Sequence, residues 1–187
     1  VQFSSLEFSL YSYLTHLSCP ECGRTYDPHQ LQSFCPDCSS PLEAQYDLPA
    51  AAAALDRDQF RARLPGGWRW HELLPVQRTE NTITLGEGDT PVLRAARLGR
   101  ELELLDLWVK DESLNPTGTF KARGLAVAIA RAAELGVERV VIPTAGNAGG
   151  ALAAYAARAG MQAHVFMPAD TPAAIVTECR AYGAEVT

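Results

Sequence analysis

Four of the five cysteines lie within 20 residues, as two Cys-x-x-Cys pairs formed by Cys19, Cys22, Cys35 and Cys38. Each pair fits a tight turn that offers two thiolates, and two such turns can complete a tetrahedral site for one Zn²⁺. Iron in a rubredoxin-like site, a disulfide framework and a ribbon without metal remain alternatives. Because no pattern indicates export, we expect a structural zinc ribbon.

The two cysteine pairs differ in the residue that follows them. Gly23 follows the first pair, whereas Ser39 follows the second. Serine can replace glycine there only if the backbone tolerates it. The fifth cysteine, Cys179, lies in a helical stretch and is predicted to be a core residue.

A second reactive group is the amine of Lys121, which follows a turn that begins at Asn115 (NPTGTFK). Thr119 is predicted to cap the next helix, which puts Lys121 in the first helical turn. The helix dipole disfavours a cation there, and apolar neighbours predict partial burial. Both effects favour the neutral amine that Schiff-base chemistry requires. A solvated lysine paired with Glu112 or Asp111 is the alternative that these residues leave open.

A third candidate is the glycine-rich segment 144–150 (TAGNAGG), which joins a predicted strand to a predicted helix. Glycines at a helix N-terminus suit an anion such as a carboxylate or a phosphate. Asn147 could instead serve only as the helix N-cap. A dinucleotide fingerprint fails on spacing, because Ala148 stands where its second glycine should be.

Alternating apolar strands and helices must position these groups. Strands are expected at 104–109, 139–143, 162–168 and from 183, and helices at 119–135, 148–159 and 172–182. Two consecutive β-α-β units predict parallel strands, with 139–143 as a buried strand. Before them, Asp47 and Pro49 begin a predicted helix at 50–64, and a short helix is expected at 68–74.

Composition narrows the class of protein. Twenty-two acidic and 16 basic residues give a net charge of −6, which argues against nucleic acid as the main partner. The chain lacks an apolar run of 18 residues, and residues 1–17 make a poor signal peptide, so we expect a cytoplasmic protein. The expected organisation is an N-terminal lead at 1–16, the ribbon at 17–47, and the front part of a longer domain at 48–187.

Two segments together, 115–124 (NPTGTFKARG) and 144–149 (TAGNAG), resemble the pyridoxal-phosphate enzymes of the tryptophan synthase β fold. Within that fold the chain is similar to the threonine synthases. The segment 85–91 (LGEGDTP) resembles their lead-in, the segments 154–160 and 178–185 add to the match, and some members carry an N-terminal zinc ribbon.

The resemblance implies an α/β, parallel-sheet three-layer fold, truncated here and preceded by the zinc ribbon. It implies pyridoxal 5′-phosphate as cofactor besides a structural Zn²⁺, with Lys121 as covalent anchor and proton shuttle. Asn147 would bind the 3′ oxygen of the cofactor, and the substrate carboxylate would be held by the backbone of Thr144, Ala145, Gly146 and Ala148. The implied reaction converts O-phospho-L-homoserine and water to L-threonine and phosphate.

The resemblance also bears on partners. It implies a small amino-acid substrate, no nucleic acid or membrane partner, and a homodimer when intact. Groups that bind the cofactor phosphate and ring nitrogen are expected beyond Thr187, so this chain alone is expected not to catalyse the reaction.

Two positions depart from the pattern of threonine synthases. Ala122 follows the lysine, where Asp is frequent, and Ala148 follows the asparagine, where Thr is frequent. Both changes remove polar groups near the site, so a related ammonia-lyase acting on serine, threonine or diaminopropionate is the alternative. A zinc-ribbon interaction module on a Rossmann-like domain is the alternative without catalysis.

Overall fold

A computed structural model describes residues 11–187, which form two compact units. Of the described residues, the first unit holds 11–64, 68–82 and 130–136. The second holds 65–67, 83–129 and 137–187. Residues 1–10 of the expected N-terminal lead lie outside the described residues.

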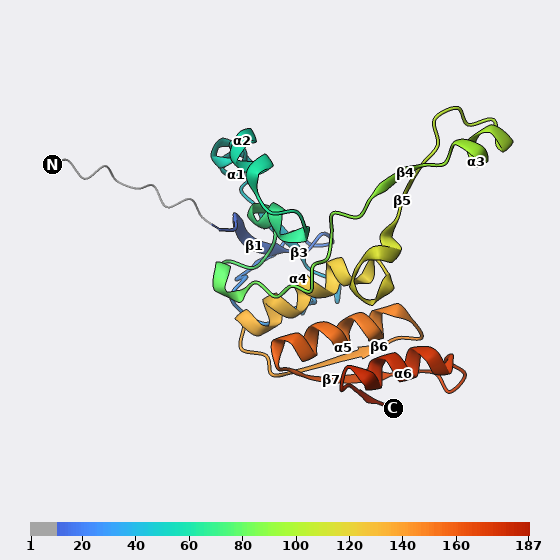
Figure 1. The fold of residues 1–187 in the computed structure, drawn as a ribbon. Coiled ribbons are helices and arrows are strands. Elements are labelled where there is room, and N and C mark those ends of the chain that lie inside the picture. The colour runs from blue at the N-terminus through green and yellow to red at the C-terminus, as the bar shows by residue number, and fades with distance from the viewer. Residues whose placement is uncertain (1–10) are drawn as a thin grey trace. The chain divides into compact units, whose positions relative to one another are not determined.

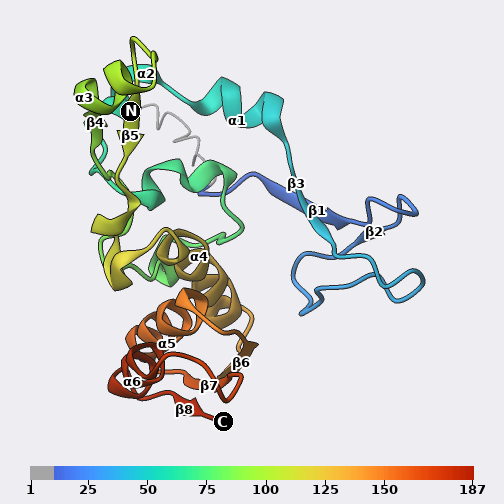
Figure 2. The ribbon, with the colours of Figure 1, turned by 90° about the vertical axis from the view of Figure 1, so that its right-hand side faces the viewer.

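The cysteine pairs belong to a small antiparallel sheet in the first unit (Figure 2). Its strands are β1 (Leu14–Ser18), β2 (Thr25–Tyr26) and β3 (Glu43–Tyr46), in the order β2-β1-β3. Leu17 pairs with Tyr26 and with Ala44. The first cysteine pair forms the turn between β1 and β2, and the second lies between β2 and β3.

Two short helices replace the single helix predicted at 50–64. They are α1 (Leu48–Ala54) and α2 (Arg57–Ala62). Asp47 caps α1 as predicted, accepting a hydrogen bond from Ala50 N at 2.9 Å. The break arises because Asp56 caps a new helix, accepting from Asp58 N and Gln59 N at 2.9 and 2.8 Å. The helix expected at 68–74 is the 3₁₀ helix η1 (Gly67–Leu73), and η2 (Thr79–Asn81) follows it.

The second unit is built on a parallel sheet in the order β6-β7-β8 (Figure 1). Its strands are β6 (Arg139–Pro143), β7 (Gln162–Phe166) and β8 (Glu185–Val186). The helices α5 (Asn147–Ala159) and α6 (Ala173–Ala181) connect them and cover one face. The two predicted β-α-β units are therefore confirmed.

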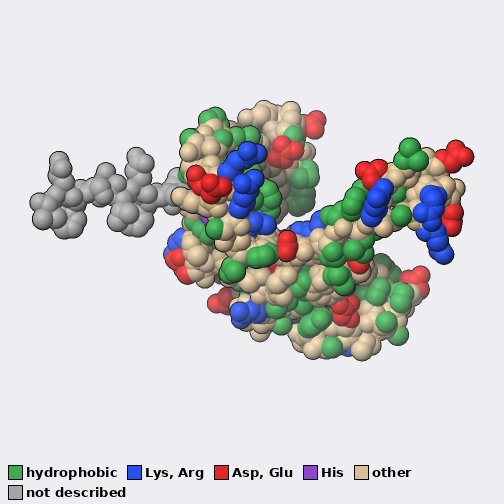
Figure 3. Space-filling view, turned by 45° about the horizontal axis from the view of Figure 1, so that its top comes forward, with side chains coloured by type: hydrophobic (Ala, Val, Ile, Leu, Met, Phe, Trp, Pro, Cys, Tyr) green, Lys and Arg blue, Asp and Glu red, His purple; other side chains and the backbone are tan. Residues whose placement is uncertain are grey.

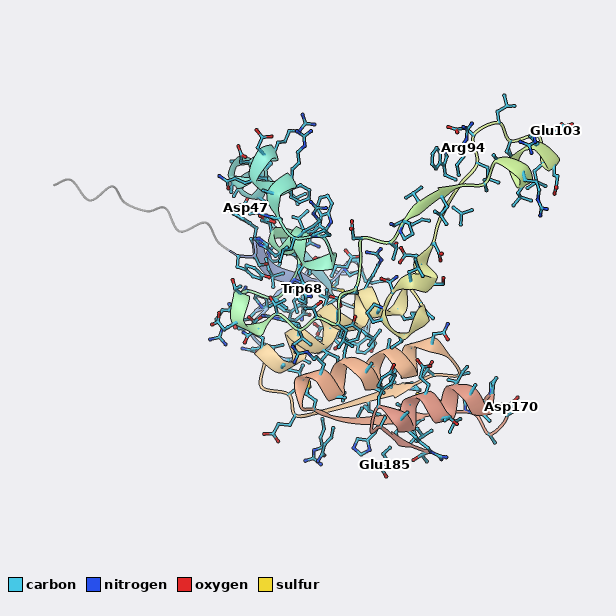
Figure 4. All side chains as sticks on the ribbon, viewed as in Figure 1. Asp47, Trp68, Arg94, Glu103, Asp170 and Glu185 are labelled. Carbon is cyan, nitrogen blue, oxygen red and sulfur yellow. The ribbon has the colours of Figure 1, made fainter. Side chains whose placement is uncertain are left out.

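The opposite face of this sheet is exposed within the described residues. Val141 and Phe166 are 64% and 49% exposed. Glu185 points away from α5 and α6 (Figure 4), and its carboxylate lies 3.0 Å from His164 Nδ1. The prediction that 139–143 is a buried strand is therefore wrong for one face, because successive side chains alternate between the two faces.

The core of the second unit lies between the sheet and the helices. Helix α4 (Lys121–Glu134) is present where a helix was predicted at 119–135, and its C-terminal end belongs to the first unit. The core cluster includes Tyr155 from α5 and Ile129 from α4. Cys179 is fully buried in the same cluster, as predicted.

An antiparallel ribbon leads into the loop that carries Lys121. It pairs β4 (Val92–Arg94) with β5 (Trp108–Lys110), and α3 (Ala96–Glu101) joins them. The strand predicted at 104–109 is wrong in its bounds, because regular pairing begins only at Trp108. Figure 3 shows apolar side chains along this ribbon and charged ones near its tip, where Figure 4 labels Glu103. After β5 come the 3₁₀ turns η3 (Glu112–Leu114) and η4 (Pro116–Gly118).

Candidate active site and metal site

Lys121 is the first residue of α4, so it lies in the first helical turn as predicted. Two consecutive residues with positive φ precede it, Thr117 at 60° and Gly118 at 66°. The hydroxyl of Thr119 accepts a hydrogen bond from Lys121 N at 3.3 Å, which confirms its capping role. A sharp turn and a capped helix start thus place the lysine.

The amine of Lys121 has no hydrogen-bond or ion-pair partner among the described residues. It lies 4.4 Å from the centre of the Phe120 ring. The carboxylates that could have paired with it are used elsewhere, because Asp111 accepts from Ser113 N at 3.1 Å and Glu112 binds Arg123. The alternative of a surface lysine paired with one of these two carboxylates is therefore wrong.

Asn147 is the first residue of α5, and Gly146 occupies the N-cap position. The side-chain amide of Asn147 has no partner within the part of the chain that the structure describes. The alternative that Asn147 only caps the helix is therefore wrong, and its amide is free to meet a ligand.

The backbone around Asn147 offers further donors. Thr144 N donates to Phe166 O at 2.9 Å, and the Thr144 hydroxyl accepts from Gly146 N at 3.2 Å. The amides of Ala145, Asn147 and Ala148 have no acceptor among residues 11–187. Unpaired N–H groups at a helix start can hold an anionic oxygen.

The last two glycines of this segment serve helix packing. A Cβ on Gly149 would lie 3.0 Å from Met167 Cε and 3.1 Å from Cys179 Sγ. A Cβ on Gly150 would lie 2.6 Å from the carboxylate of Glu178 on α6. Their lack of a side chain lets α6 and the end of β7 approach α5.

The lysine loop and the asparagine loop lie at the same end of the second unit. The turn η4 packs against α5, and α4 and α5 begin on the same side in Figure 1. This side holds the carboxyl ends of β6 and β7, and Figure 4 shows Asp170 in the next turn there. Ligands of open parallel sheets bind at this edge, so the two loops can act on one small molecule.

A buried carboxylate, Glu87, was not singled out from the sequence. Its Oε2 accepts hydrogen bonds from the Tyr155 hydroxyl at 2.6 Å, Leu85 N at 3.1 Å and the Thr84 hydroxyl at 3.1 Å. Burial and the bond to Glu87 both raise the pKa of Tyr155. This carboxylate ties the segment 83–91 to the helix that begins at Asn147. The sequence signal that could have found Glu87 is its place between two glycines, Gly86 and Gly88.

A second carboxylate, Glu112, anchors the lysine loop. Arg123 binds it with Nε at 2.6 Å and Nη2 at 2.8 Å, and the Thr90 hydroxyl donates to it at 2.6 Å. The side-chain amide of Asn115 donates to it at 2.9 Å. The bonds from Arg123 and Thr90 hold the pKa of Glu112 down at about 2.

The four predicted metal ligands come together in the first unit. All four Sγ atoms lie within 4.8 Å of one another, with Cys19 and Cys38 at 3.3 Å and Cys22 and Cys35 at 3.7 Å. Sulfurs around a tetrahedral zinc are about 3.8 Å apart, whereas a disulfide needs about 2.05 Å. The geometry fits a four-thiolate metal site and not a disulfide framework.

Both cysteine turns have the same backbone form. Gly23 N donates to Cys19 O and Ser39 N to Cys35 O, each at 2.9 Å. Ser39 has a φ of 56° beside 73° for Gly23, so serine does adopt the left-handed conformation. The Tyr26 hydroxyl lies 3.0 Å from Cys35 Sγ, and this hydrogen bond is the largest cause that lowers the pKa of Cys35 to about 6.

The loop between the cysteine pairs is bound to the C-terminal end of α4. Arg131 donates to the Pro28 carbonyl and pairs with Glu134. Glu134 also accepts from Gln77 N at 3.0 Å and Asn81 Nδ2 at 2.9 Å. Burial alone would raise the pKa of Glu134, but these bonds lower it.

Comparison with known proteins decides the family. The family described as "Pyridoxal-phosphate dependent enzyme" matches residues 83–187, which is more than half of the chain and includes both loops. The chain belongs to this family. This match confirms the resemblance, the parallel sheet agrees with it, and the family description implies pyridoxal phosphate as the cofactor of the members.

Individual relatives of this pyridoxal-phosphate dependent enzyme carry more specific names. The threonine synthase of Methanocaldococcus jannaschii is 40% identical over 169 residues, covering 90% of this chain and 42% of that protein. The threonine synthase of Methanosarcina acetivorans is 36% identical over 172 residues, covering 91% and 42%. The chain therefore spans under half the length of these curated relatives.

A solved structure supports the fold of the enzyme. A pyridoxal 5′-phosphate-dependent aspartate racemase matches with a TM-score of 0.51 and 36% identity, covering 52% of this chain and 31% of that one. Among residues 11–187, no helix is both long enough and apolar enough to cross a membrane.

Proposed function

We propose that this enzyme is a threonine synthase-like lyase, which converts O-phospho-L-homoserine and water to L-threonine and phosphate. The observation that carries the proposal is the unpaired amine of Lys121 at a helix start, within a chain 40% identical to a threonine synthase. In this reaction the carbon–oxygen bond to the phosphate breaks, and water supplies the hydroxyl of threonine.

Lys121 would bind the aldehyde of the cofactor and move a proton at the substrate. Its amine is free of carboxylate partners, so no ion pair has to break before it reacts. Lys110 is the only other lysine in the chain. It is the last residue of β5, and its amine donates to Thr90 O at 2.6 Å.

Asn147 would donate its free amide to the 3′ oxygen of the cofactor. The amides of Ala145 and Ala148 would hold the substrate carboxylate at the start of α5. The amides of Thr144 and Gly146 donate to Phe166 O and to the Thr144 hydroxyl, so these two residues of the predicted set would shape the loop. When bound, pyridoxal phosphate supplies the electron sink for charge that develops on the substrate carbon.

The four cysteines would bind one structural Zn²⁺. Four thiolates complete the tetrahedron and leave no position for a catalytic water. In this proposal, residues 17–47 are the ribbon and 48–187 the front part of a catalytic domain in a cytoplasmic homodimer. Elemental analysis that finds iron, or no metal, would overturn the zinc assignment.

A related ammonia-lyase acting on serine, threonine or diaminopropionate is the second candidate. The observation that favours it is Ala122, which follows Lys121 and is fully buried in the apolar core. An aspartate at this position, which is frequent in threonine synthases, would bury a carboxylate in this apolar core at a cost in stability. The core of this chain therefore suits alanine there.

The test is to supply the intact protein with each substrate class and measure the products. Threonine and phosphate formed in equal amounts from O-phospho-L-homoserine support the proposal. Ammonia released from serine, threonine or diaminopropionate, with no phosphate release, would establish the second candidate. A colourless protein with neither activity would indicate the interaction module without catalysis.

A further inference from the structure

Lys121 and Arg123 lie two residues apart in the first turn of α4. With 3.6 residues per turn, their side chains leave the helix about 200° apart and thus on nearly opposite sides. An interaction that fixes the side chain of Arg123 therefore also fixes the rotation of this helical turn, and with it the direction in which Lys121 projects. The intervening Ala122 is fully buried and leaves little freedom for the turn to rotate.

Glu112 holds Arg123 through two parallel hydrogen bonds, at 2.6 and 2.8 Å. Paired bonds of this kind fix the orientation of a guanidinium as well as its position. Glu112 lies before the turn at residues 115–119, and Arg123 lies after Lys121. The pair therefore closes the loop that presents the lysine.

The loop between these two residues contains a strained turn, which the hydrogen bonds to Glu112 stabilise. Thr117 has a left-handed backbone, which a residue with a side chain adopts only at an energetic cost. Asn115, which is 5% exposed, donates to the Glu112 carboxylate and accepts from Gly88 N at 3.0 Å. Thr90 donates to the same carboxylate. The bonds to Glu112 thus join three segments around a strained turn.

We propose that Glu112 is a positioning residue, which acts through Arg123 to direct the amine of Lys121 toward the cofactor aldehyde. The inference rests on the proposed role of Lys121. It gives Glu112 no contact with substrate or cofactor.

The test uses the intact protein, stripped of cofactor and mixed with pyridoxal phosphate. Glu112→Gln keeps the shape of the side chain but removes its charge. Arg123→Lys keeps the charge but removes the planar guanidinium that makes two parallel hydrogen bonds. Each should lower the rate constant for the rise of visible absorbance about tenfold, as expected for loss of a charged hydrogen bond. The pH midpoint of that absorbance should also shift in each variant, which loss of stability alone would not cause.

The double variant should be no slower than the slower single variant, because both changes remove one contact. The matched control is Glu101→Gln, which removes the charge of an exposed Glu101–Arg97 pair and should leave rate and midpoint unchanged. Additive effects, or single variants that match this control, would overturn the inference. Lys121→Ala separates the two claims: if it keeps the absorbance change, the proposed role of Lys121 has failed.

Discussion

Gly86 and Gly88 lie in one loop and both have a positive φ, of 92° and 99°. They differ in surroundings. A Cβ on Gly86 would meet nothing within 4 Å, whereas one on Gly88 would lie 2.6 Å from Gly67 N and 2.9 Å from Gly66 C. Because these are backbone atoms, they cannot move aside as a flexible side chain can. The two positions therefore separate backbone strain from a steric clash.

Gly86→Ala should lower the free energy of unfolding by about 1–2 kcal/mol, the cost of a side chain at positive φ. Gly88→Ala carries the same strain and also pushes the 66–67 segment away. That shift breaks the hydrogen bond from Gly67 N to Glu87 O and weakens the one from Gly88 N to Asn115. At about 1 kcal/mol for each bond, the total loss should be about 3–4 kcal/mol.

Urea unfolding followed by circular dichroism measures both losses, and amide exchange at Gly67 reports the local opening. Equal losses for Gly86→Ala and Gly88→Ala, or unchanged exchange at Gly67 in Gly88→Ala, would show that the clash at Gly88 does not displace the 66–67 segment.

Three further predictions concern buried or paired polar groups. Tyr155→Phe removes the 2.6 Å bond to Glu87 and should lower the free energy of unfolding by about 2 kcal/mol in urea titrations. Glu112 has a pKa of about 2 when folded, below that of the unfolded chain, so its contribution to stability should be full above about pH 5 and lost as the pH falls toward 2. Tyr26→Phe removes the hydroxyl beside Cys35 and should speed loss of zinc to a chelator about tenfold or more.

A matched substitution controls the result for Tyr155→Phe. Tyr182→Phe removes a hydroxyl from a tyrosine that is 41% exposed and should change stability by less than about 0.5 kcal/mol. If Tyr155→Phe has no larger effect, the Glu87 contact does not stabilise the fold. If Glu112→Gln loses the same stability at pH 2 as at pH 7, the ion pair is not the cause. Zinc loss in Tyr26→Phe that matches the parent would assign the hydroxyl no role.

Local rules predicted the parallel half of the fold well. The strand at 139–143 has the predicted bounds, and α5 begins one residue earlier than predicted. Regular alternation and glycine at helix ends carry these signals, because Gly160 ends α5 in the left-handed conformation. The antiparallel pair β4–β5 was harder to predict, because β4 has only three residues and is defined only by its pairing with β5.

The chemical groups were predicted from the sequence, but the groups that hold them were not. Lys121, Asn147 and the four cysteines stand in recognisable patterns. Glu87 and Glu112 do not, because Tyr155 lies 68 residues from Glu87, Thr90 lies 22 residues from Glu112, and a carboxylate in a loop is ordinarily solvated. Their roles depend on burial and on contacts between segments, which spacing does not encode.

One labelling experiment directly tests whether Lys121 binds the cofactor covalently. The intact protein is saturated with pyridoxal phosphate, reduced with borohydride, digested and mapped by mass spectrometry. We expect the pyridoxyl group on Lys121 and its loss in Lys121→Ala. A label on Lys110, or at any other position when Lys121 is intact, would contradict it.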